Sequence, residues 1–282
     1  MAAALVDRDG ALLARARRPT PPGADAETLF AALADLAGDV LAETGERPVV
    51  ACGVGCGGPM APGGEAVSPL NIPGWRDFPL RTRLADLTAL PTAVDNDAKA
   101  LAAGEGWIGA ARGCADFVAM VVSTGIGGGI VLDGRMLQGA EGNAGHIGHV
   151  VVEPDGRRCV CGGRGCLEAE ASGLAIEAAT GHPPTAAPPE VIERTGRLVG
   201  RAVASVANLL DLRLAVVAGS VALGFGEPFF AAATAELRAR ATLSFSRATR
   251  IVPAGLGGDG PLVGAALVGW RHHDDLCEQD TR

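Results

Sequence analysis

Residues that commonly bind transition metals are concentrated in one short stretch of the sequence. His149 is followed by Cys159, Cys161 and Cys166. One imidazole and three thiolates are the number and kind of ligands found in a closed tetrahedral zinc site. The glycines in the segment 162–165 allow the tight turn that brings two thiolates onto one ion. Because such a site leaves no coordination position open, the pattern predicts a structural zinc ion that fixes a loop.

Two other interpretations of these residues are ordinary buried thiols and a disulfide. Four ligands in a glycine-rich frame favour a metal over isolated core residues. The chain has seven cysteines, an odd number, and Cys159 and Cys161 are too close in sequence to pair comfortably. The sequence also shows no signal peptide. We therefore expect reduced cysteines and a cytoplasmic protein.

A second polar cluster, Asp95-Asn96-Asp97, lies where a predicted strand passes into a predicted helix. An Asp at such a junction usually caps the helix by accepting a backbone N–H bond. Two aspartates beside an asparagine are more polar than a cap requires. The cluster is therefore a candidate for chemistry as well as for capping.

The glycine-rich segment from Thr124 to Gly129 is a candidate phosphate-binding turn. Glycines let backbone N–H groups approach a phosphate closely, and Thr124 adds a hydroxyl. The segment is predicted to lead into a strand at 130–132 rather than into a helix. The pattern therefore supports neither a dinucleotide-binding fingerprint nor a P-loop.

The segment 60–77 is predicted to be a long irregular loop. Loops of this length in compact domains are often functional. Asn71 could bind a hydroxyl group there, or it could cap a turn. Trp75 could border a binding site or fill the core.

The remaining elements follow from apolar periodicity and from glycine and proline positions. A hairpin with its turn at 7–10 opens the chain, and alternating strands and helices follow it. We expect helices at 25–43, 174–179, 190–211, 227–241 and 262–270, strands at 48–55, 117–123, 130–132, 214–218 and 250–253, and a strand-to-helix unit at 90–105. The tail from His272 to Arg282 is polar and is expected to fray, without a metal role for His272 or His273.

Composition limits the classes of partner. The chain has 282 residues, enough for two modest domains around a cleft. Hydrophobic residues make up 48% of the chain, but none of its apolar runs is long enough to span a membrane. The net charge of −8 argues against nucleic acid as a partner. We expect a soluble protein that binds neither membranes nor nucleic acid.

The string Gly-x-Ala-Gly-x-Ile-Gly-His, followed by Cys-x-Cys-Gly-x-x-Gly-Cys-x-Glu, resembles the signature of the ROK family of bacterial sugar kinases and sugar-responsive repressors. It spans 142–149 and 159–168. The resemblance implies an α/β chain with the two-lobed actin-like ATPase fold (sugar kinase/ribonuclease H-like) and a zinc-bound loop. It also implies lobes at 1–115 and 116–282, and phosphorylation of a hexose by ATP with Mg²⁺ in a homodimer.

The resemblance also assigns roles to residues, in three groups. Asp97 would be the catalytic base, Asn71, Asn96, His146, His149 and Glu168 would lie around the sugar, and Thr124, Gly125, Gly127, Gly219 and Ser220 would lie around the nucleotide. Two of these positions depart from the family pattern. His146 replaces a glutamate that normally bonds sugar hydroxyls, and Gly219-Ser220 replaces a run of three glycines.

A further departure is at the start of the chain, which begins after the point where the family has a first strand and an Asp-x-Gly-Gly-Thr-Lys phosphate loop. Either an upstream start was missed or the loop is lost; an in-frame Gly-Gly-Thr-Lys in the upstream DNA would decide. A lost loop would favour a catalytically weak or silent sugar-binding protein. A sugar-responsive regulator is the other alternative, and this chain would lack the DNA-binding domain of such regulators.

Overall fold

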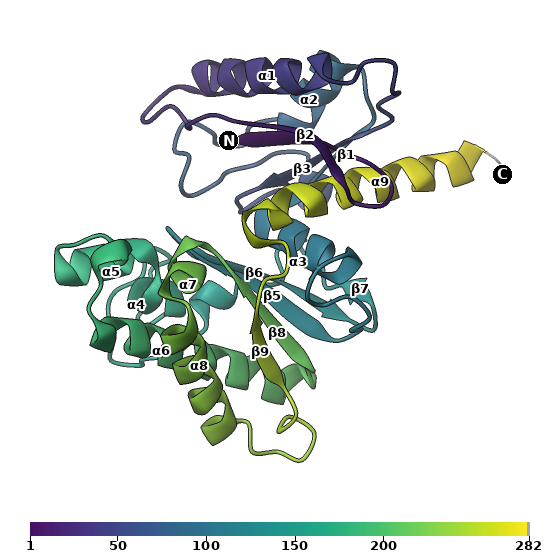
Figure 1. The fold of residues 1–282 in the computed structure, drawn as a ribbon. Coiled ribbons are helices and arrows are strands. Elements are labelled where there is room, and N and C mark those ends of the chain that lie inside the picture. Colours follow the sequence, from purple (N-terminus) through teal and green to yellow (C-terminus); the bar gives the residue numbers. More distant parts are fainter. Residues whose placement is uncertain (281–282) are drawn as a thin grey trace. The chain divides into compact units, whose positions relative to one another are not determined.

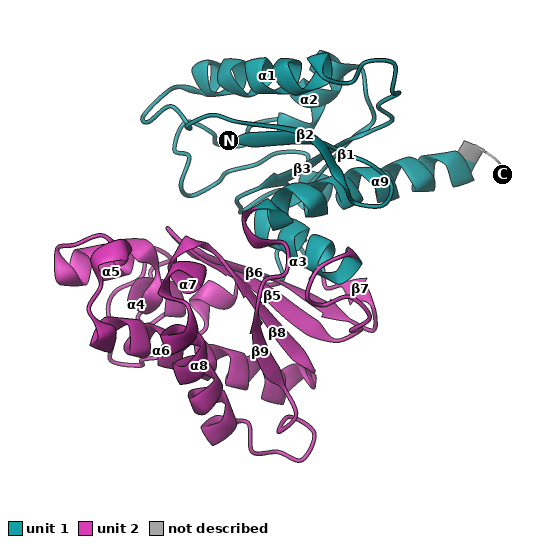
Figure 2. Ribbon diagram, viewed as in Figure 1, with its two compact units in different colours: residues 1–107, 138–144, 259–282 teal, residues 108–137, 145–258 magenta. Residues whose placement is uncertain are grey.

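The computed structural model describes residues 1–280 and resolves two compact units (Figure 1). Unit 1 comprises residues 1–107, 138–144 and 259–282, and unit 2 comprises residues 108–137 and 145–258 (Figure 2). Each unit has its own cluster of buried apolar side chains. The predicted lobes follow the order of the chain, whereas these units do not, because the last helix returns to unit 1.

In the described residues, unit 1 contains two pairs of strands with helices packed on them. Strands β1 (Ala2–Val6) and β2 (Leu12–Arg17) form the predicted antiparallel hairpin, and β3 (Cys52–Cys56) pairs in parallel with β4 (Thr92–Asn96). The helices are α1 (Ala26–Ala42), α2 (Leu80–Thr88), α3 (Asp97–Trp107) and α9 (Gly260–Asp280). As predicted, 60–77 is mostly irregular, with one short 3₁₀ turn at Pro62–Gly64.

The final helix is longer than predicted. We expected a helix at 262–270 and a frayed tail from His272, but α9 continues to Asp280, so the expected fraying is wrong for 272–280. Contacts with the hairpin explain the difference. Arg8 lies over the Trp270 ring, 4.9 Å from its centroid, and its guanidinium bonds Asp274 at 2.6 Å. The last two residues of the predicted tail, 281–282, lie outside the described residues.

Unit 2 is built on a sheet of order β7-β6-β5-β8-β9. Its strands are β5 (Phe117–Val122), β6 (Ile126–Leu132), β7 (Arg135–Met136), β8 (Leu214–Ala218) and β9 (Arg250–Pro253). The pairs β5–β8 and β8–β9 are parallel, and β5–β6 is antiparallel. Because β5 and β8 are buried on both faces, they read as continuous apolar runs in the sequence.

The helices of unit 2 are α4 (Leu167–Ala171), α5 (Gly173–Thr180), α6 (Pro189–Leu210), α7 (Ser220–Phe225) and α8 (Glu227–Arg240), and short 3₁₀ turns lie at Ile147–His149 and Pro184–Ala186. Helix α6 packs along α8, as Figure 1 shows. The short helices α4 and α7 have too few turns to show a period in the sequence. Among the described residues, no helix has the length and apolar character that a membrane span requires.

The glycine-rich segment differs from its prediction. Only Ser123–Gly125 forms the turn, and β6 begins at Ile126, so Gly127–Gly129 lie within the strand. The reason is close packing: a β-carbon at Gly128 would lie 2.9 Å from Ile147 Cγ2. These glycines therefore let the turn that contains His149 approach the sheet.

Candidate functional site

Two predicted site residues lie at the carboxyl edge of the β3–β4 pair in unit 1. In the parallel register Cys56 is opposite Asn96, so both strands end at the same edge. Asn96 is the last residue of β4, and Asp97 is the first residue of α3. The Asp97 residue is exposed and Asn96 is half-buried. This edge therefore presents an amide and a carboxylate to a ligand.

The side chain of Asn96 caps α3. Its Oδ1 accepts the Ala98 N–H at 2.9 Å, so of the two roles expected for Asp95, helix cap or bystander, the structure leaves the second. Asp95 Oδ1 instead accepts the Asn96 N–H at 2.7 Å and lies 3.8 Å from Lys99 Nζ. Asp95 therefore bonds the backbone of its neighbour and faces Lys99, and Asn96 takes the capping role.

The thiol of Cys56 marks this edge as a partly desolvated environment. Burial, reinforced by the charge of Asp97, raises the pKa of Cys56 to about 12. The thiol is therefore neutral at physiological pH. A β-carbon at Gly55 would lie 3.3 Å from Asp97 Cα, so α3 packs directly on β3.

Asn71 lies in the loop that follows β3, near the same edge. A β-carbon at Gly57 would lie 3.3 Å from Asn71 Oδ1, which places the amide next to the end of β3. Arg76 donates to the carbonyls of Pro69 and Ile72 at 3.0 and 3.1 Å and so holds this loop. Trp75 is only 3% exposed and stacks on Phe78, so it fills the core, which is one of the two roles considered for it.

The predicted nucleotide residues of unit 2 converge on the turn between β5 and β6. Thr124 and Gly125 form this turn, and Ser123 Oγ lies 2.9 Å from Ser220 Oγ. A β-carbon at Gly219 would lie 2.2 Å from the Val122 carbonyl oxygen, so Gly219 also packs on the end of β5.

One of the residues predicted to lie around the nucleotide is apart from this turn. Gly127 pairs with Val121 inside the β-ladder. Thr124, Gly125, Gly219 and Ser220 are thus brought together, and Gly127 lies further along the strand.

Glu168 connects the same turn to α4. Its Oε2 accepts the Ile126 N–H at 2.8 Å and would lie 2.8 Å from a β-carbon at Gly125. The α5 amide of Gly173 also donates to the Ser123 carbonyl at 2.7 Å. The turn is therefore held by backbone and side-chain bonds from two helices.

His146 and His149 lie at the two ends of one short 3₁₀ segment. Their ring centroids are 6.0 Å apart with an interplanar angle of 24°. His146 is exposed and His149 is half-buried. The residue that departs from the family pattern therefore lies beside the predicted metal ligand.

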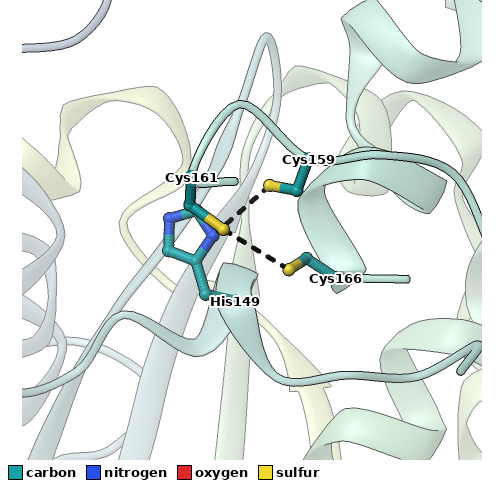
Figure 3. Close-up of side chains that lie close together, drawn as sticks. All are labelled: His149, Cys159, Cys161 and Cys166. Atoms are coloured by element: carbon teal, nitrogen blue, oxygen red, sulfur yellow. Dashed lines mark hydrogen bonds between the residues drawn. The ribbon is translucent and has the colours of Figure 1, made fainter. Parts of the chain in front are cut away.

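The four predicted metal ligands converge, as Figure 3 shows. The ligand atoms of His149, Cys159, Cys161 and Cys166 all lie within 4.8 Å of one another. Cys159 Sγ is 3.6 Å from His149 Nδ1, and Cys161 Sγ is 3.7 Å from Cys166 Sγ. Sulfurs about 2.3 Å from a tetrahedral zinc ion lie about 3.7 Å apart. The donor set and its spacing therefore fit zinc, and the sulfurs are too far apart for a disulfide.

The protein environment by itself shifts the pKa values of these three thiols in different directions. Burial raises the pKa of Cys159, and it raises that of Cys166 to about 12. The Gly163 backbone N–H lowers the pKa of the exposed Cys161. A bound metal favours the thiolate form, so binding to this cluster would release protons.

Residues 151–166 form an antiparallel hairpin that carries the three cysteine ligands, here called the cysteine hairpin, and helix α6 holds its base. Arg201 donates to the Val152 carbonyl at 2.7 Å, and Arg194 bonds the buried Glu170 carboxylate at 2.6 Å. Gly165, with φ of 70°, passes so close to the Glu153 carbonyl that a β-carbon would lie 1.6 Å from it. A side chain at this position would therefore displace the hairpin.

Sequence reasoning missed three residues around the site: Ser123, Lys99 and Asn143. Ser123 bonds Ser220, and Lys99 and Asn143 connect segments of unit 1. Only Lys99 had a signal in the sequence, because it is the sole lysine in the chain.

Comparisons with known proteins match most of the chain. The model of one protein family, described as ROK family, matches residues 1–271. An N-acetylmannosamine kinase of Escherichia fergusonii is 36% identical over 241 residues, which cover 80% of this chain and 81% of that kinase.

Solved structures show the same similarity. The ROK hexokinase from Thermus thermophilus is 35% identical, with a TM-score of 0.83 over 97% of this chain and 95% of that one. A ROK family glucokinase from Streptomyces griseus, solved in complex with glucose and AMPPNP, is 28% identical, with a TM-score of 0.83 over 95% of each chain.

Proposed function

Because the chain belongs to the ROK family and is a sugar kinase, we propose that it transfers the γ-phosphoryl group of ATP to a hexose. The observation that supports this assignment most directly is the Asn96-Asp97 pair at the carboxyl edge of β3 and β4. Phosphoryl transfer requires an oriented hydroxyl, a base and stabilisation of the phosphate charge. Residues of this chain can supply each of these.

Asp97 is the proposed base. Its carboxylate accepts the proton of the attacking sugar hydroxyl as the bond to phosphorus forms. Asn96 and Asn71 orient that sugar through hydroxyl hydrogen bonds, and both lie at the edge where Asp97 begins α3. Orientation of this kind reduces the entropy that the reaction must lose.

His146, His149 and Glu168 are the proposed sugar ligands from unit 2. Glu168 already accepts one backbone N–H through Oε2. A carboxylate has further acceptor positions, so the same group can also accept a sugar hydroxyl. The His146 imidazole replaces a carboxylate of the family pattern and can donate a hydrogen bond, for example to an acetamido oxygen.

The β5–β6 turn is the proposed phosphate site. Thr124 and Gly125 donate from a hydroxyl and from backbone N–H groups, and Gly219 and Ser220 border the nucleoside. Gly127 is a less direct candidate because it lies inside the strand. When Mg²⁺ is bound with ATP, it supplies positive charge that stabilises the transferred group.

Zinc at His149 and the three cysteines is proposed as a structural ion. The four ligands fill a tetrahedral site, which leaves no position for substrate. The cluster would hold His149, and the hairpin before α4, in a fixed orientation. No step of the reaction passes through this ion.

N-acetylmannosamine is the first sugar to test, since a kinase named for it is 36% identical. We would measure ADP release with N-acetylmannosamine, glucose, mannose and N-acetylglucosamine, with ATP or polyphosphate as donor. Turnover of one sugar at a kcat/KM well above that of the others would support the proposal. Sugar-independent ATP hydrolysis alone would argue against it.

A sugar-binding protein without turnover is the second candidate, favoured by His146 in place of the usual glutamate. Calorimetry with the same sugars distinguishes the two functions. Binding without ADP release would replace the kinase assignment with this one.

A further inference from the structure

Lys99 is the only lysine in a chain that has 24 lysines and arginines in total. Its side chain is 1% exposed. The ammonium group donates to Gln138 Oε1 and to the Gly142 carbonyl, both at 2.6 Å, and lies 3.8 Å from Asp95 Oδ1. A buried charge is costly unless it is paired and hydrogen-bonded, and Lys99 meets both conditions.

The chemistry of this site favours lysine over arginine. An ammonium is compact and directs three N–H groups to separate acceptors, whereas a guanidinium is a planar fork. Burial lowers the pKa of Lys99, and the charge of Asp95 opposes that effect. Both hydrogen-bond acceptors belong to the segment 138–144, and the Asp95 carboxylate, at ion-pair distance, belongs to the end of β4, so Lys99 joins two segments that are distant in sequence.

The first segment is a small closed loop at 138–144, which belongs to unit 1. Its two ends are joined by the bond from the Ala144 N–H to the Gln138 carbonyl at 2.9 Å. Asn143 accepts the Met60 N–H at 3.4 Å and donates to the Met60 carbonyl at 3.3 Å. The 138–144 loop is thus bonded both to Lys99 and to the start of the loop that contains Asn71.

We propose that Lys99 is a positioning residue for sugar binding, which holds the 138–144 loop against the helix of the proposed base. This inference rests on the proposed function. Asp97 lies two residues before Lys99 on α3, and Met60, which Asn143 bonds, begins the Asn71 loop. One ammonium group therefore connects, within unit 1, the segments that present Asp97 and Asn71.

Substitution of Lys99 tests this role through the two Michaelis constants. Lys99→Met keeps the length of the side chain and removes its charge and donors. We expect the KM for the sugar to rise at least about tenfold, while the KM for ATP and the zinc content stay within twofold. Glu141→Gln, an exposed change on the same loop, is the matched control and should leave both constants unchanged.

A second variant covers the case in which Lys99→Met does not fold. Gln138 is exposed, so Gln138→Leu removes one acceptor without opening the core. We expect a rise of about threefold in the KM for the sugar. The inference is overturned if both variants leave this KM unchanged, or if both KM values and the active fraction change together.

The single lysine also permits a direct spectroscopic test. Protein labelled with ¹⁵N-lysine should give one side-chain ammonium signal. Coupling between two sites is reciprocal, so a sugar that binds more tightly because of Lys99 must itself stabilise the Lys99 contacts. We expect the sugar to slow hydrogen exchange of this ammonium about tenfold, and a non-hydrolysable ATP analogue alone to have no such effect.

Failure of this inference differs from failure of the proposed function. If the wild-type protein phosphorylates a sugar but neither the KM nor the ammonium exchange responds, only the role of Lys99 is lost. If no sugar is bound or phosphorylated, the proposed function falls, and the role of Lys99 falls with it.

Discussion

Asp97 and Asn96 are adjacent in sequence but have different surroundings. Asn96 Oδ1 accepts the N–H of Ala98, the second residue of α3, which fixes the Asn96 side chain, whereas the exposed Asp97 begins the helix. The positive end of the helix dipole stabilises a carboxylate at that position. The same junction thus supplies a fixed amide and a charged acceptor.

Replacement of the proposed base separates catalysis from binding. Asp97→Asn keeps an oxygen that can accept the Ala98 N–H, so the start of α3 should remain intact. General-base catalysis contributes about 10²–10⁴-fold, and we expect kcat to fall by that factor. Calorimetry should show sugar affinity within a few-fold of the wild type. Substantial remaining turnover would remove Asp97 from the role of base.

At the scale of single residues, functional side chains could be predicted from the sequence where their types and spacing suit one kind of chemistry. The zinc ligands were found because a histidine and three cysteines in one stretch suit few other purposes. The cap of α3 could not be assigned from the sequence, because Asp95, Asn96 and Asp97 are all residue types that cap helices. In the structure the Ala98 N–H donates to Asn96 Oδ1 and to Asp97 Oδ1, whereas Asp95 lies near Lys99, whose hydrogen bonds go to the distant 138–144 loop.

At the scale of elements, Glu170 connects α4, α6 and the cysteine hairpin. Its buried carboxylate accepts the Arg157 N–H and bonds Arg194. Burial alone would raise the pKa of Glu170, but these bonds outweigh it and hold the pKa below its usual value. A carboxyl with a depressed folded pKa stabilises the fold above its unfolded pKa, and this stabilisation is lost as the pH falls through the folded value.

Glu170→Gln should therefore destabilise unit 2 by about 2 kcal/mol at pH 7, the value typical of a hydrogen bond to a charged group. The difference from the wild type should shrink below about pH 4, because glutamate protonates first in the unfolded chain and then, at lower pH, in the folded protein. Urea denaturation followed by circular dichroism measures both. Glu193→Gln on the exposed face of α6 is the control and should change stability by less than about 1 kcal/mol. Equal effects of the two variants would contradict the role given to Glu170.

Helices α3 and α9 pack so closely that a glycine is required between them. A β-carbon at Gly264 would lie 1.5 Å from the Ala100 carbonyl oxygen. Gly264→Ala should destabilise unit 1 by about 3 kcal/mol, because neither backbone can move away easily. Gly38→Ala is the control: a β-carbon there meets nothing within 4 Å, and the change should stabilise α1 by about 0.5–1 kcal/mol. Similar melting curves for the two variants would contradict this packing.

Helices and strands could be predicted from the sequence where they are long enough for the hydrophobic pattern to repeat. Helix α6 was found because apolar residues recur along one face over 22 residues. The start of β6 was not, because Gly127–Gly129 resemble a turn in sequence but pair with β5 in the sheet, where Ile147 packs closely on Gly128. The end of α9 was missed for the same kind of reason, since Arg8 comes from the opposite end of the chain.

At the scale of the whole molecule, the predicted ROK membership and actin-like α/β fold class are confirmed by the family match and by the solved relatives. The grouping of segments into units was harder to predict. The chain enters unit 2 twice, at residues 108 and 145, and returns to unit 1 at 138 and 259. The 138–144 loop and α9 join unit 1 through contacts that no local sequence pattern reveals.

This division gives each unit a separate spectroscopic probe. The chain has three tryptophans, Trp75, Trp107 and Trp270, and all lie in unit 1, whereas the metal ligands all lie in unit 2. Tryptophan emission therefore reports on unit 1, and circular dichroism reports on both units. Removal of the metal should therefore shift the unfolding transition seen by circular dichroism more than the one seen by tryptophan emission.

We expect the purified protein to hold one zinc ion per chain, and a chelator to lower the melting temperature seen by circular dichroism by about 5–10 °C, because a structural zinc contributes directly to folding. The tryptophan transition should move much less. Cys161→Ser should reproduce the effect of the chelator, and Cys277→Ser, which changes an exposed cysteine of unit 1, should not. Protein isolated without zinc, or equal shifts of both transitions, would show that the cluster does not stabilise unit 2 through a metal.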